Sequence, residues 1–283
     1  MDRTPRFYNW CFASTCNAGC PYCFSRDSYA KQLADGARWW SDDDAIEAWA
    51  SLAEKYGEGV ILFTGLEAGN ELPLVNHIAR YHKGILQTNM TFDLDDLVRY
   101  VPPSRVSIQP TFHPHLWDFD IEKFIAKARE MVLEYGYVIT EVVIVAWPTY
   151  VPNLPHWVRR LQDSGFTANV FPCRHCKHNG EPLPAGYTQE QREVISHYSG
   201  PCYENGVDFK PLNISACSAG RDTVCVMLDG TVQRCAQVAN IGHPGMGEQN
   251  LMRDRNIVFD TEPRPCYEKT CRCEQLYRYH IHE

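Results

Sequence analysis

The chain has 283 residues, enough for one large domain or for one domain with a small appendage. Lysine and arginine total 27 against 35 for aspartate and glutamate, and the resulting net charge of −8 disfavours general nucleic-acid binding. No run approaches the roughly eighteen apolar residues of a membrane span, and the first residues lack the apolar stretch of a signal peptide. We therefore expect a cytoplasmic protein with no nucleic-acid or membrane partner.

Strand-like and helix-like runs alternate from the start of the chain to about residue 200. Strands are predicted at 6–12, 60–64, 85–88, 105–109, 138–145 and 168–171, and helices at 41–56, 70–81, 94–100, 121–135, 154–162 and 187–197. Ser41, followed by three aspartates, is typical of a helix start, and the β-branched run 138–145 is typical of a strand buried on both faces. Six alternating strands and helices predict an α/β fold, a partial (β/α)6 barrel with parallel strands.

The pattern changes after about residue 200. Residues 224–228 and 231–234, on either side of Asp229-Gly230, predict a β-hairpin. The tail is rich in cysteine, arginine and tyrosine, and is too short to form a core of its own unless a metal site stabilises it. We expect a barrel domain over 1–200 and a small cysteine-rich C-terminal domain over 201–283.

The chain has 13 cysteines, an odd number that favours metal or redox chemistry over structural disulfides where no export signal is present. Some of them can be small buried apolar residues, and Cys225 is one candidate. The cysteines fall into three groups: 11, 16, 20 and 23; 173, 176 and 202; and 217, 225, 235, 266, 271 and 273.

The first group contains the spacing Cys-x3-Cys-x2-Cys, at Cys16, Cys20 and Cys23. Three thiolates on one short loop can hold three irons of a [4Fe-4S] cluster and leave the fourth iron without a protein ligand. Such an open position can bind a substrate, as the open position of a catalytic zinc does. A zinc site is the alternative, with Cys11 as its fourth ligand, although Cys11 lies within the predicted first strand.

This motif, with the aromatic Tyr22 before its last cysteine, resembles the motif of the radical S-adenosylmethionine enzymes. The resemblance covers almost the whole chain and implies that Tyr22 contacts the cofactor. It also implies that the open iron binds the amino and carboxylate groups of S-adenosylmethionine. In that family the reduced cluster cleaves this cofactor to methionine and a 5′-deoxyadenosyl radical, which abstracts a hydrogen atom from the substrate.

The sequence 64–68, Thr-Gly-Leu-Glu-Ala, resembles the family's Gly-Gly-Glu-Pro-like motif, with Leu66 and Ala68 in place of its second glycine and its proline. By this resemblance, Glu67 accepts a hydrogen bond from the cofactor's amino group, and Gly65 allows the backbone to approach closely. The alternative is an ordinary loop between a strand and a helix.

Three polar residues near the ends of the third and fourth predicted strands match family positions that contact the ribose and carboxylate of the cofactor. They are Asn89, Ser107 and Gln109. Ligands of such barrels bind beyond the carboxyl ends of the strands, which agrees with this assignment. The alternative is that these side chains satisfy buried backbone groups.

The C-terminal third resembles the SPASM domain and the shorter twitch domain, which carry auxiliary iron–sulfur clusters in some of these enzymes. The resemblance is carried by Cys217 and by Gly-x4-Cys235 on the predicted hairpin. Three cysteines follow Cys235, which suits one auxiliary cluster rather than two. The expected ligands are Cys217, Cys235, Cys271 and Cys273, with Cys266 in reserve. A structural zinc site on these thiols is the alternative.

Two other features fall on the expected active face. The pair Cys173-x2-Cys176 could supply a thiol, Cys173, that returns a hydrogen atom to a substrate radical, or it could do nothing chemical. It could also bind a second auxiliary cluster together with Cys202 and either Cys225 or Cys266. His113 could orient or deprotonate the substrate, or it could be an ordinary loop histidine.

The sequence thus predicts an enzyme that abstracts a hydrogen atom from a small molecule or a short peptide-like substrate. Oxidation, rearrangement and epimerisation all remain open as outcomes. The expected partners also include a low-potential electron donor such as flavodoxin or ferredoxin. Two alternatives remain: an enzyme that modifies ribosomal peptides, and a non-catalytic iron–sulfur protein that transfers electrons.

Overall fold

The computed structural model describes residues 6–23, 25–200, 203–209, 217–235, 246 and 248–264. The predicted ligands Cys271 and Cys273, and also Cys202 and Cys266, lie outside the described residues. No helix within these ranges is long and apolar enough to cross a membrane.

Eight strands form one sheet in the order β12-β11-β1-β2-β3-β4-β5-β6. Their bounds are β1 (Phe7–Ala13), β2 (Val60–Gly65), β3 (Lys83–Thr88), β4 (Val106–Phe112), β5 (Val142–Ala146), β6 (Ala168–Pro172), β11 (Thr223–Val226) and β12 (Val232–Gln233). Neighbouring strands from β11 to β6 are parallel, and β12 is antiparallel to β11. The predicted α/β fold with a partial barrel of six successive strands is confirmed.

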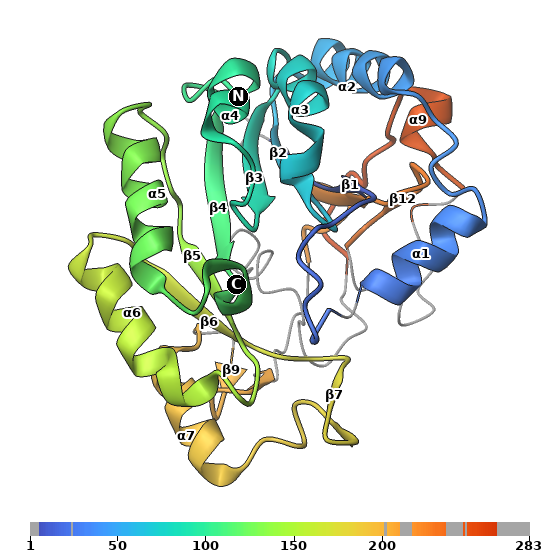
Figure 1. Ribbon diagram of the computed structural model, residues 1–283. Helices are drawn as coiled ribbons and strands as arrows, with labels where there is room; N and C mark the ends of the chain where they lie inside the picture. Colours follow the sequence, from blue (N-terminus) through green and yellow to red (C-terminus); the bar gives the residue numbers. More distant parts are fainter. Residues whose placement is uncertain are drawn as a thin grey trace.

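Helices follow the strands and cover one face of the sheet (Figure 1). They are α1 (Arg26–Ala34), α2 (Asp42–Tyr56), α3 (Leu72–Ala79), α4 (Leu94–Tyr100), α5 (Ile121–Leu133), α6 (Leu154–Asp163), α7 (Gln189–Tyr198) and α9 (Leu251–Asp254). Short 3-10 helices are η1 (Ala68–Glu71), η2 (Pro114–Trp117) and η3 (Val151–Asn153), and two small ladders join β7 (Lys177–His178) to β8 (Glu181–Pro182) and β9 (Tyr203–Glu204) to β10 (Asp208–Phe209).

Local sequence explains where most helices begin. Ser41 accepts a hydrogen bond from the backbone of Asp44, whose side chain in turn accepts one from the Ser41 backbone, so α2 begins in a capping box as predicted. The structure adds α1, which the sequence did not predict. This helix buries none of its residues, and it therefore lacks the apolar stripe by which an amphipathic helix is identified.

The strand predicted at 138–145 is shorter in the structure, because β5 begins only at Val142. Residues 138–140 contact β4 at Ile108: the Ile108 backbone donates to Val138 O, and Thr140 N donates to Ile108 O. Val138 is 60% exposed. The β-branched run therefore predicts a longer strand than the structure has, because regular pairing with β6 begins only at Val142.

The two faces of the sheet differ in burial. Side chains that face the helices, such as Trp10, Phe12 and Phe63, are fully buried. Side chains on the inner face, such as Ser107 and Thr111 of β4, are half-buried and often polar. The barrel interior is therefore more open than the layer beneath the helices, and this is the surface on which a ligand can bind.

The predicted hairpin is present and extends the main sheet. Cys225 and Val226 of β11 pair with Gln233 and Val232 of β12, and β11 also pairs along β1. The connection is longer than a two-residue turn, and Gly230 adopts a positive φ of 84° within it. The predicted boundary between domains near residue 200 stays a prediction, but this part of the C-terminal region pairs directly with the barrel.

His82 gives the fold a testable dependence on pH. This fully buried ring accepts a hydrogen bond from Gly59 N at Nδ1 (3.0 Å) and donates from Nε2 to Trp49 O (2.9 Å). Burial lowers its pKa, against the opposing effect of the Trp49 carbonyl. A second proton, on Nδ1, would face the Gly59 N–H donor, so the folded state disfavours the charged ring.

Because unfolded His82 takes up a proton before the folded form does, stability should fall as the pH drops below about 6.5, with a limiting slope of about 1.4 kcal/mol per pH unit. Urea unfolding at pH 7 and pH 5 measures this slope. The variant His82→Gln, which has no titrating ring, should show a smaller slope. An equal slope in both proteins would contradict the assignment.

Candidate active site

The predicted cluster-binding cysteines lie on the loop between β1 and α1, at the end of the sheet where the parallel strands end (Figure 1). Cys16 is exposed, Cys23 is half-buried and Cys20 is buried. Cys23 N donates to Cys20 O (3.2 Å), and Ala18 N donates to the Cys16 sulfur (3.3 Å). The loop is thus folded back on itself, which brings its three thiols to one region.

Hydrogen bonds from three strand ends hold this loop in place. After β3, Asn89 Nδ2 donates to Asn17 Oδ1 (2.9 Å). After β2, Asn70 Nδ2 donates to Thr15 Oγ1 (3.1 Å), and after β4, Nε2 of His115 donates to Ala18 O (2.9 Å). Sequence reasoning did not predict these tethers, because their residues lie 55 to 97 positions apart in the chain.

The thiols of Cys16 and Cys20 lie in a protein environment that favours their protonated form. Burial raises the pKa of Cys20 to about 12, and the neighbouring Cys16 adds to the shift. Burial likewise raises the pKa of Cys16, and Glu67 and Cys23 add to it. A bound cationic metal centre deprotonates such thiols, so the donor set fits a cluster that supplies positive charge. Among the described residues, no three His, Cys, Asp or Glu side chains are close enough to hold a single metal ion.

Tyr22 is held by residues from the ends of β4 and β5. Its hydroxyl lies 2.8 Å from His113 Nδ1, and its ring contacts Trp147 and Tyr150 with centroid distances of 5.7 and 6.0 Å. Burial lowers the pKa of His113 to about 3 and raises that of Tyr22, so the neutral imidazole accepts the hydrogen bond from the phenol. His113 is therefore placed to orient Tyr22 and the adjacent Cys20, whose sulfur lies 3.5 Å from the same nitrogen.

Glu67 lies beyond the end of β2 and is 5% exposed. Its Oε1 accepts from Gly69 N (2.8 Å) and its Oε2 accepts from Asn89 N (2.7 Å). Burial raises the pKa of this carboxyl, while hydrogen bonds from Thr88, Asn89 and Gly69 oppose the shift. An ionised carboxylate accepts up to about four hydrogen bonds, so Glu67 can hold these backbone groups and a ligand donor together.

The structure requires glycine at position 65 because the backbone of Ala13 lies too close for a side chain, which the sequence alone did not predict. The φ of Gly65 is +136°, and a Cβ at this position would lie 2.5 Å from Ala13 O and 2.6 Å from Ala13 N. The residue therefore allows the end of β2 to pass close to the end of β1, directly before the cysteine loop. A direct approach of the cofactor to Gly65 stays a prediction.

We expect Gly65→Ala to lower the free energy of unfolding by about 1–3 kcal/mol, because the new methyl would displace the Ala13 backbone. Chemical denaturation measures this change. Gly136→Ala is the matched control: its φ is also positive, at +73°, but a Cβ there meets nothing within 4 Å. Equal losses for the two variants would show that backbone strain, rather than the close approach to Ala13, sets the cost.

Of the other predicted cofactor residues, Asn89 lies just beyond the end of β3, whereas Ser107 and Gln109 lie within β4. Asn89, at the end of β3, is bonded to the cysteine loop as described above. Ser107 Oγ donates to Gly84 O (3.3 Å), and Gln109 Nε2 donates to Glu141 Oε1 (2.8 Å). Glu141 was not predicted as a site residue: it lies within the β-branched run 138–145, directly before β5, and no local motif distinguishes it from a surface glutamate.

Cys173 is buried at the end of β6 and forms a disulfide with Cys176. Its backbone N–H donates to the Tyr187 hydroxyl (2.6 Å), which donates in turn to Ala146 O (2.6 Å). A disulfide has no thiol hydrogen to transfer. Hydrogen-atom donation by Cys173 therefore stays a prediction that applies to the reduced pair.

Two cysteines of the expected auxiliary site, Cys217 and Cys235, lie within the described residues. Cys217 pairs through its backbone with Arg264 (N–O distances of 2.7 and 3.1 Å), and Cys235 packs on the inner face against Phe7 and Leu62. Both are half-buried. Their roles as ligands stay predictions.

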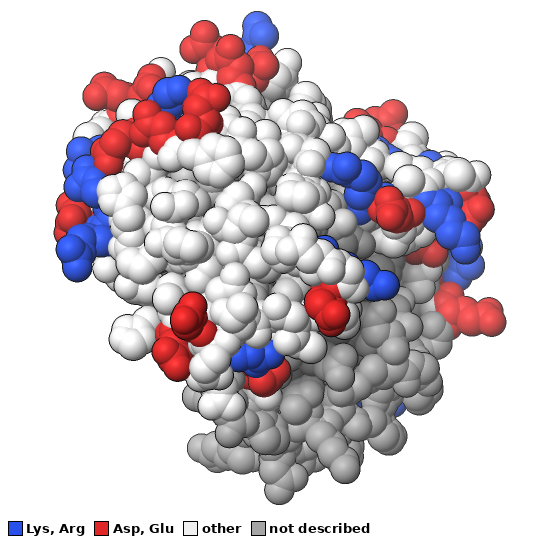
Figure 2. Space-filling view, turned by 60° about the horizontal axis from the view of Figure 1, so that its bottom comes forward, with Lys and Arg blue, Asp and Glu red and all other residues white. Residues whose placement is uncertain are grey.

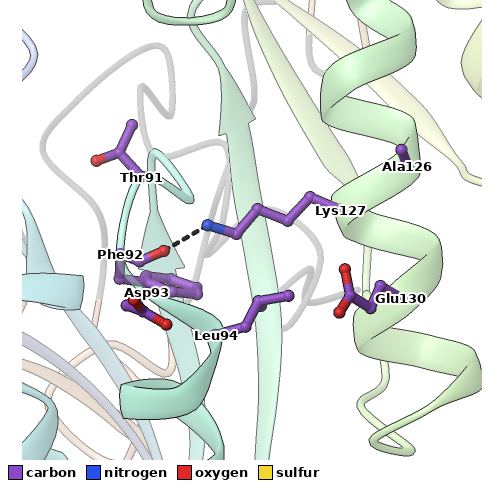
Figure 3. Close-up of a pocket in the computed structure, with 7 residues that line it drawn as sticks. All are labelled: Thr91, Phe92, Asp93, Leu94, Ala126, Lys127 and Glu130. Carbon is purple, nitrogen blue, oxygen red and sulfur yellow. Dashed lines mark hydrogen bonds between the residues drawn. The ribbon is translucent and has the colours of Figure 1, made fainter.

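A surface pocket lies outside the barrel, between the loop that follows β3 and helix α5 (Figure 3). Its lining residues are Thr91, Phe92, Asp93, Leu94, Ala126, Lys127 and Glu130. Lys127 donates to Phe92 O across this pocket. None of the predicted site residues lines it, so the candidate active site is the strand-end region instead.

Figure 2 turns the end of the barrel that carries the cysteine loop toward the viewer. Charged side chains gather at the margins of this face, and its central part carries few of them.

Solved structures share this fold. Native anSMEcpe with bound AdoMet and Kp18Cys peptide aligns with a TM-score of 0.57 and 15% identity, over 88% of this chain and 78% of that one. SuiB from Streptococcus suis aligns with a TM-score of 0.54 and 13% identity, over 88% of this chain and 64% of that one. No family model and no curated protein matches the sequence. The expected fold, that of the radical S-adenosylmethionine enzymes, is confirmed.

Proposed function

We propose that this chain is a radical S-adenosylmethionine enzyme that acts on a short peptide or a small molecule. The observation that carries the proposal is the tethering of the Cys16–Cys20–Cys23 loop to the ends of β2, β3 and β4, with Glu67 close enough to Cys16 to affect its pKa. A protein that only relays electrons has no need for a buried carboxylate and a half-open polar barrel beside its cluster.

In this proposal Cys16, Cys20 and Cys23 bind three irons of a [4Fe-4S] cluster. When bound there, the cluster and S-adenosylmethionine supply a carbon radical that removes a hydrogen atom from the substrate. The protein's own contribution is to position the cofactor and to exclude water.

Two of the predicted cofactor residues, Glu67 and Tyr22, have defined roles in this proposal. Glu67 accepts a hydrogen bond from the ammonium group of S-adenosylmethionine, which adds a charge-assisted bond to those from Gly69 N and Asn89 N. Tyr22, fixed by His113, closes the site on the side of β4 and β5. His113 is neutral and already bonded, so we assign it a positioning role rather than that of a base.

The peptide bound in one solved structure of the same fold favours a peptide substrate for this chain, and a small molecule remains the second candidate. A low-potential flavodoxin or ferredoxin is proposed as the electron donor. Cys217 and Cys235 are proposed ligands of one auxiliary iron–sulfur cluster, together with Cys271 and Cys273. That cluster would accept the second electron of an oxidation or relay electrons to the site.

Anaerobic reconstitution with iron and sulfide, followed by reduction with dithionite in the presence of S-adenosylmethionine, tests the function. We expect 5′-deoxyadenosine and methionine to form in equal amounts. A reconstituted protein that carries a reducible cluster but neither binds nor cleaves S-adenosylmethionine would contradict the proposal and favour electron transfer.

A further inference from the structure

One backbone N–H group of the cysteine loop is directed at a predicted cluster ligand. Ala18 N donates to the Cys16 sulfur (3.3 Å). Ala18 is buried, at 7% exposed, so its N–H group needs an acceptor within the protein. A thiolate is a stronger acceptor than a thiol, because it carries a negative charge. This hydrogen bond therefore gains strength when a bound cluster keeps Cys16 deprotonated.

The peptide unit that carries this N–H group is held on its first side by the segment after β3. Asn17 Nδ2 donates to Thr91 Oγ1 (2.8 Å), and Asn89 Nδ2 donates to Asn17 Oδ1 (2.9 Å). Thr91 Oγ1 donates in turn to Asn89 Oδ1 (2.6 Å). The three side chains form a closed ring of hydrogen bonds, which fixes residue 17 relative to the end of β3.

The second side of the same unit is held by His115, which follows β4 and is half-buried. Its Nε2 donates to Ala18 O (2.9 Å), and because a carbonyl oxygen can only accept, this nitrogen must carry the proton. In the neutral ring Nδ1 is then an acceptor, and the Tyr150 hydroxyl lies 3.4 Å from it. The contact with Tyr150 thus favours the tautomer that the bond to Ala18 requires.

We propose that His115 and Asn17 are positioning residues that set the reduction potential of the cluster by directing the Ala18 N–H group at the Cys16 sulfur. Reduction adds an electron to a centre that already has negatively charged thiolate ligands, and an N–H dipole aimed at one of their sulfurs stabilises the added charge. Hydrogen bonds to the sulfurs are among the factors that set the potentials of iron–sulfur clusters. The inference rests on the proposed function in one respect, namely that Cys16 is a cluster ligand.

A redox titration followed by electron paramagnetic resonance tests the role of His115. It uses anaerobically reconstituted protein without S-adenosylmethionine, and the signal that Cys16→Ala removes identifies the cluster. At the wild-type midpoint potential, His115→Leu should lower the ratio of reduced to oxidised cluster about threefold to tenfold, where tenfold corresponds to about 59 mV for one electron. His115→Gln should restore most of the ratio, because the glutamine Nε2 can donate to Ala18 O from nearly the same place as the histidine Nε2.

Asn17→Ala tests the other side of the peptide unit. Asn17 is exposed, so we expect this variant to fold and to keep its iron, and its result decides the matter if His115→Leu assembles no cluster. The ratio should again fall, by about threefold. His156→Leu is the matched control for His115→Leu, because His156 is an exposed histidine of α6, and this variant should keep the wild-type ratio.

An unchanged ratio in Asn17→Ala or in cluster-containing His115→Leu would overturn the inference. A loss in His115→Leu that glutamine does not reverse would also overturn it, because packing rather than the hydrogen bond would then set the potential. Formation of 5′-deoxyadenosine by the wild-type protein is measured separately. Its absence, together with a potential that depends on His115 and Asn17, would refute the proposed function and retain the inference. Its presence with equal potentials in all variants would refute the inference alone.

Discussion

Replacing Cys16, Cys20 or Cys23 with alanine is expected to remove about four irons per chain and to abolish formation of 5′-deoxyadenosine. Each of these thiols lies on the tethered loop. Burial and the neighbouring thiols raise the pKa of Cys20, so a bound metal centre is needed to keep this thiol deprotonated. Loss of one ligand leaves two, too few to keep the cluster in this position. Iron content, the visible spectrum and product analysis together measure the effect.

Cys11→Ala is the matched control. Cys11 lies in β1, five positions before Cys16, and its thiol interacts with Cys225 of β11 and with Tyr29 rather than with the loop. We expect this variant to keep both the cluster and the cleavage of S-adenosylmethionine. If Cys11 proved essential and S-adenosylmethionine left the spectrum of the cluster unchanged, the open-iron hypothesis would be wrong and a four-thiol site would replace it.

Local patterns in the sequence were sufficient to predict the barrel. Strands β2, β3 and β6 are short apolar runs between helices with an apolar stripe, and the order of these runs fixes a parallel sheet. The sequence could not predict where each ladder stops. The start of β5 depends on its alignment with β6, and α1 has no buried face, so neither feature leaves a periodic pattern.

The residues of the candidate site can also be divided into those that a local sequence pattern predicts and those that depend on how the strands align. The three cysteines could be identified because their spacing is local, and Glu67 because the segment 64–68 resembles a short family motif. The hydrogen bonds that link Gln87 of β3, Gln109 of β4, Glu141 before β5 and Asn169 of β6 span 22, 32 and 28 positions. Such contacts depend on register, which one sequence does not specify, so Gln109 alone was predicted, and for a different partner.

Tyr22 and His113 show a further limit of sequence reasoning. Both were predicted as site residues, but their mutual bond spans 91 positions and changes what the histidine can do. A histidine whose pKa falls to about 3 is neutral at physiological pH. Its position on the active face was predictable from the strand order, whereas its protonation state depends on packing.

Glu67→Gln is expected to weaken binding of S-adenosylmethionine tenfold to a hundredfold. A carboxylate against an ammonium group forms a charge-assisted bond of about 1.5–3 kcal/mol, and about 1.4 kcal/mol corresponds to a factor of ten in affinity. The amide retains the shape of the side chain but removes the charge. Equilibrium binding to the reconstituted protein, followed by the change in the cluster spectrum, measures the loss.

The same variant should also lower the free energy of unfolding by about 1–3 kcal/mol, because it introduces a second donor among buried donors. Both carboxylate oxygens of Glu67 accept backbone N–H groups, one from Gly69 and one from Asn89. Whichever way the new amide is turned, its NH2 group faces one of them. Glu130→Gln, an exposed change of the same chemistry, should alter neither affinity nor stability.

Measuring both quantities separates the two roles of Glu67. A loss of stability with unchanged affinity for S-adenosylmethionine would show that the carboxylate only holds the backbone after β2 and β3, and would remove the segment 65–68 from the cofactor site. A loss of affinity at pH values where the variant is fully folded would assign the ammonium contact to Glu67. Cluster content should stay at the wild-type level in either case, because Glu67 forms no bond to the cysteine ligands among the described hydrogen bonds.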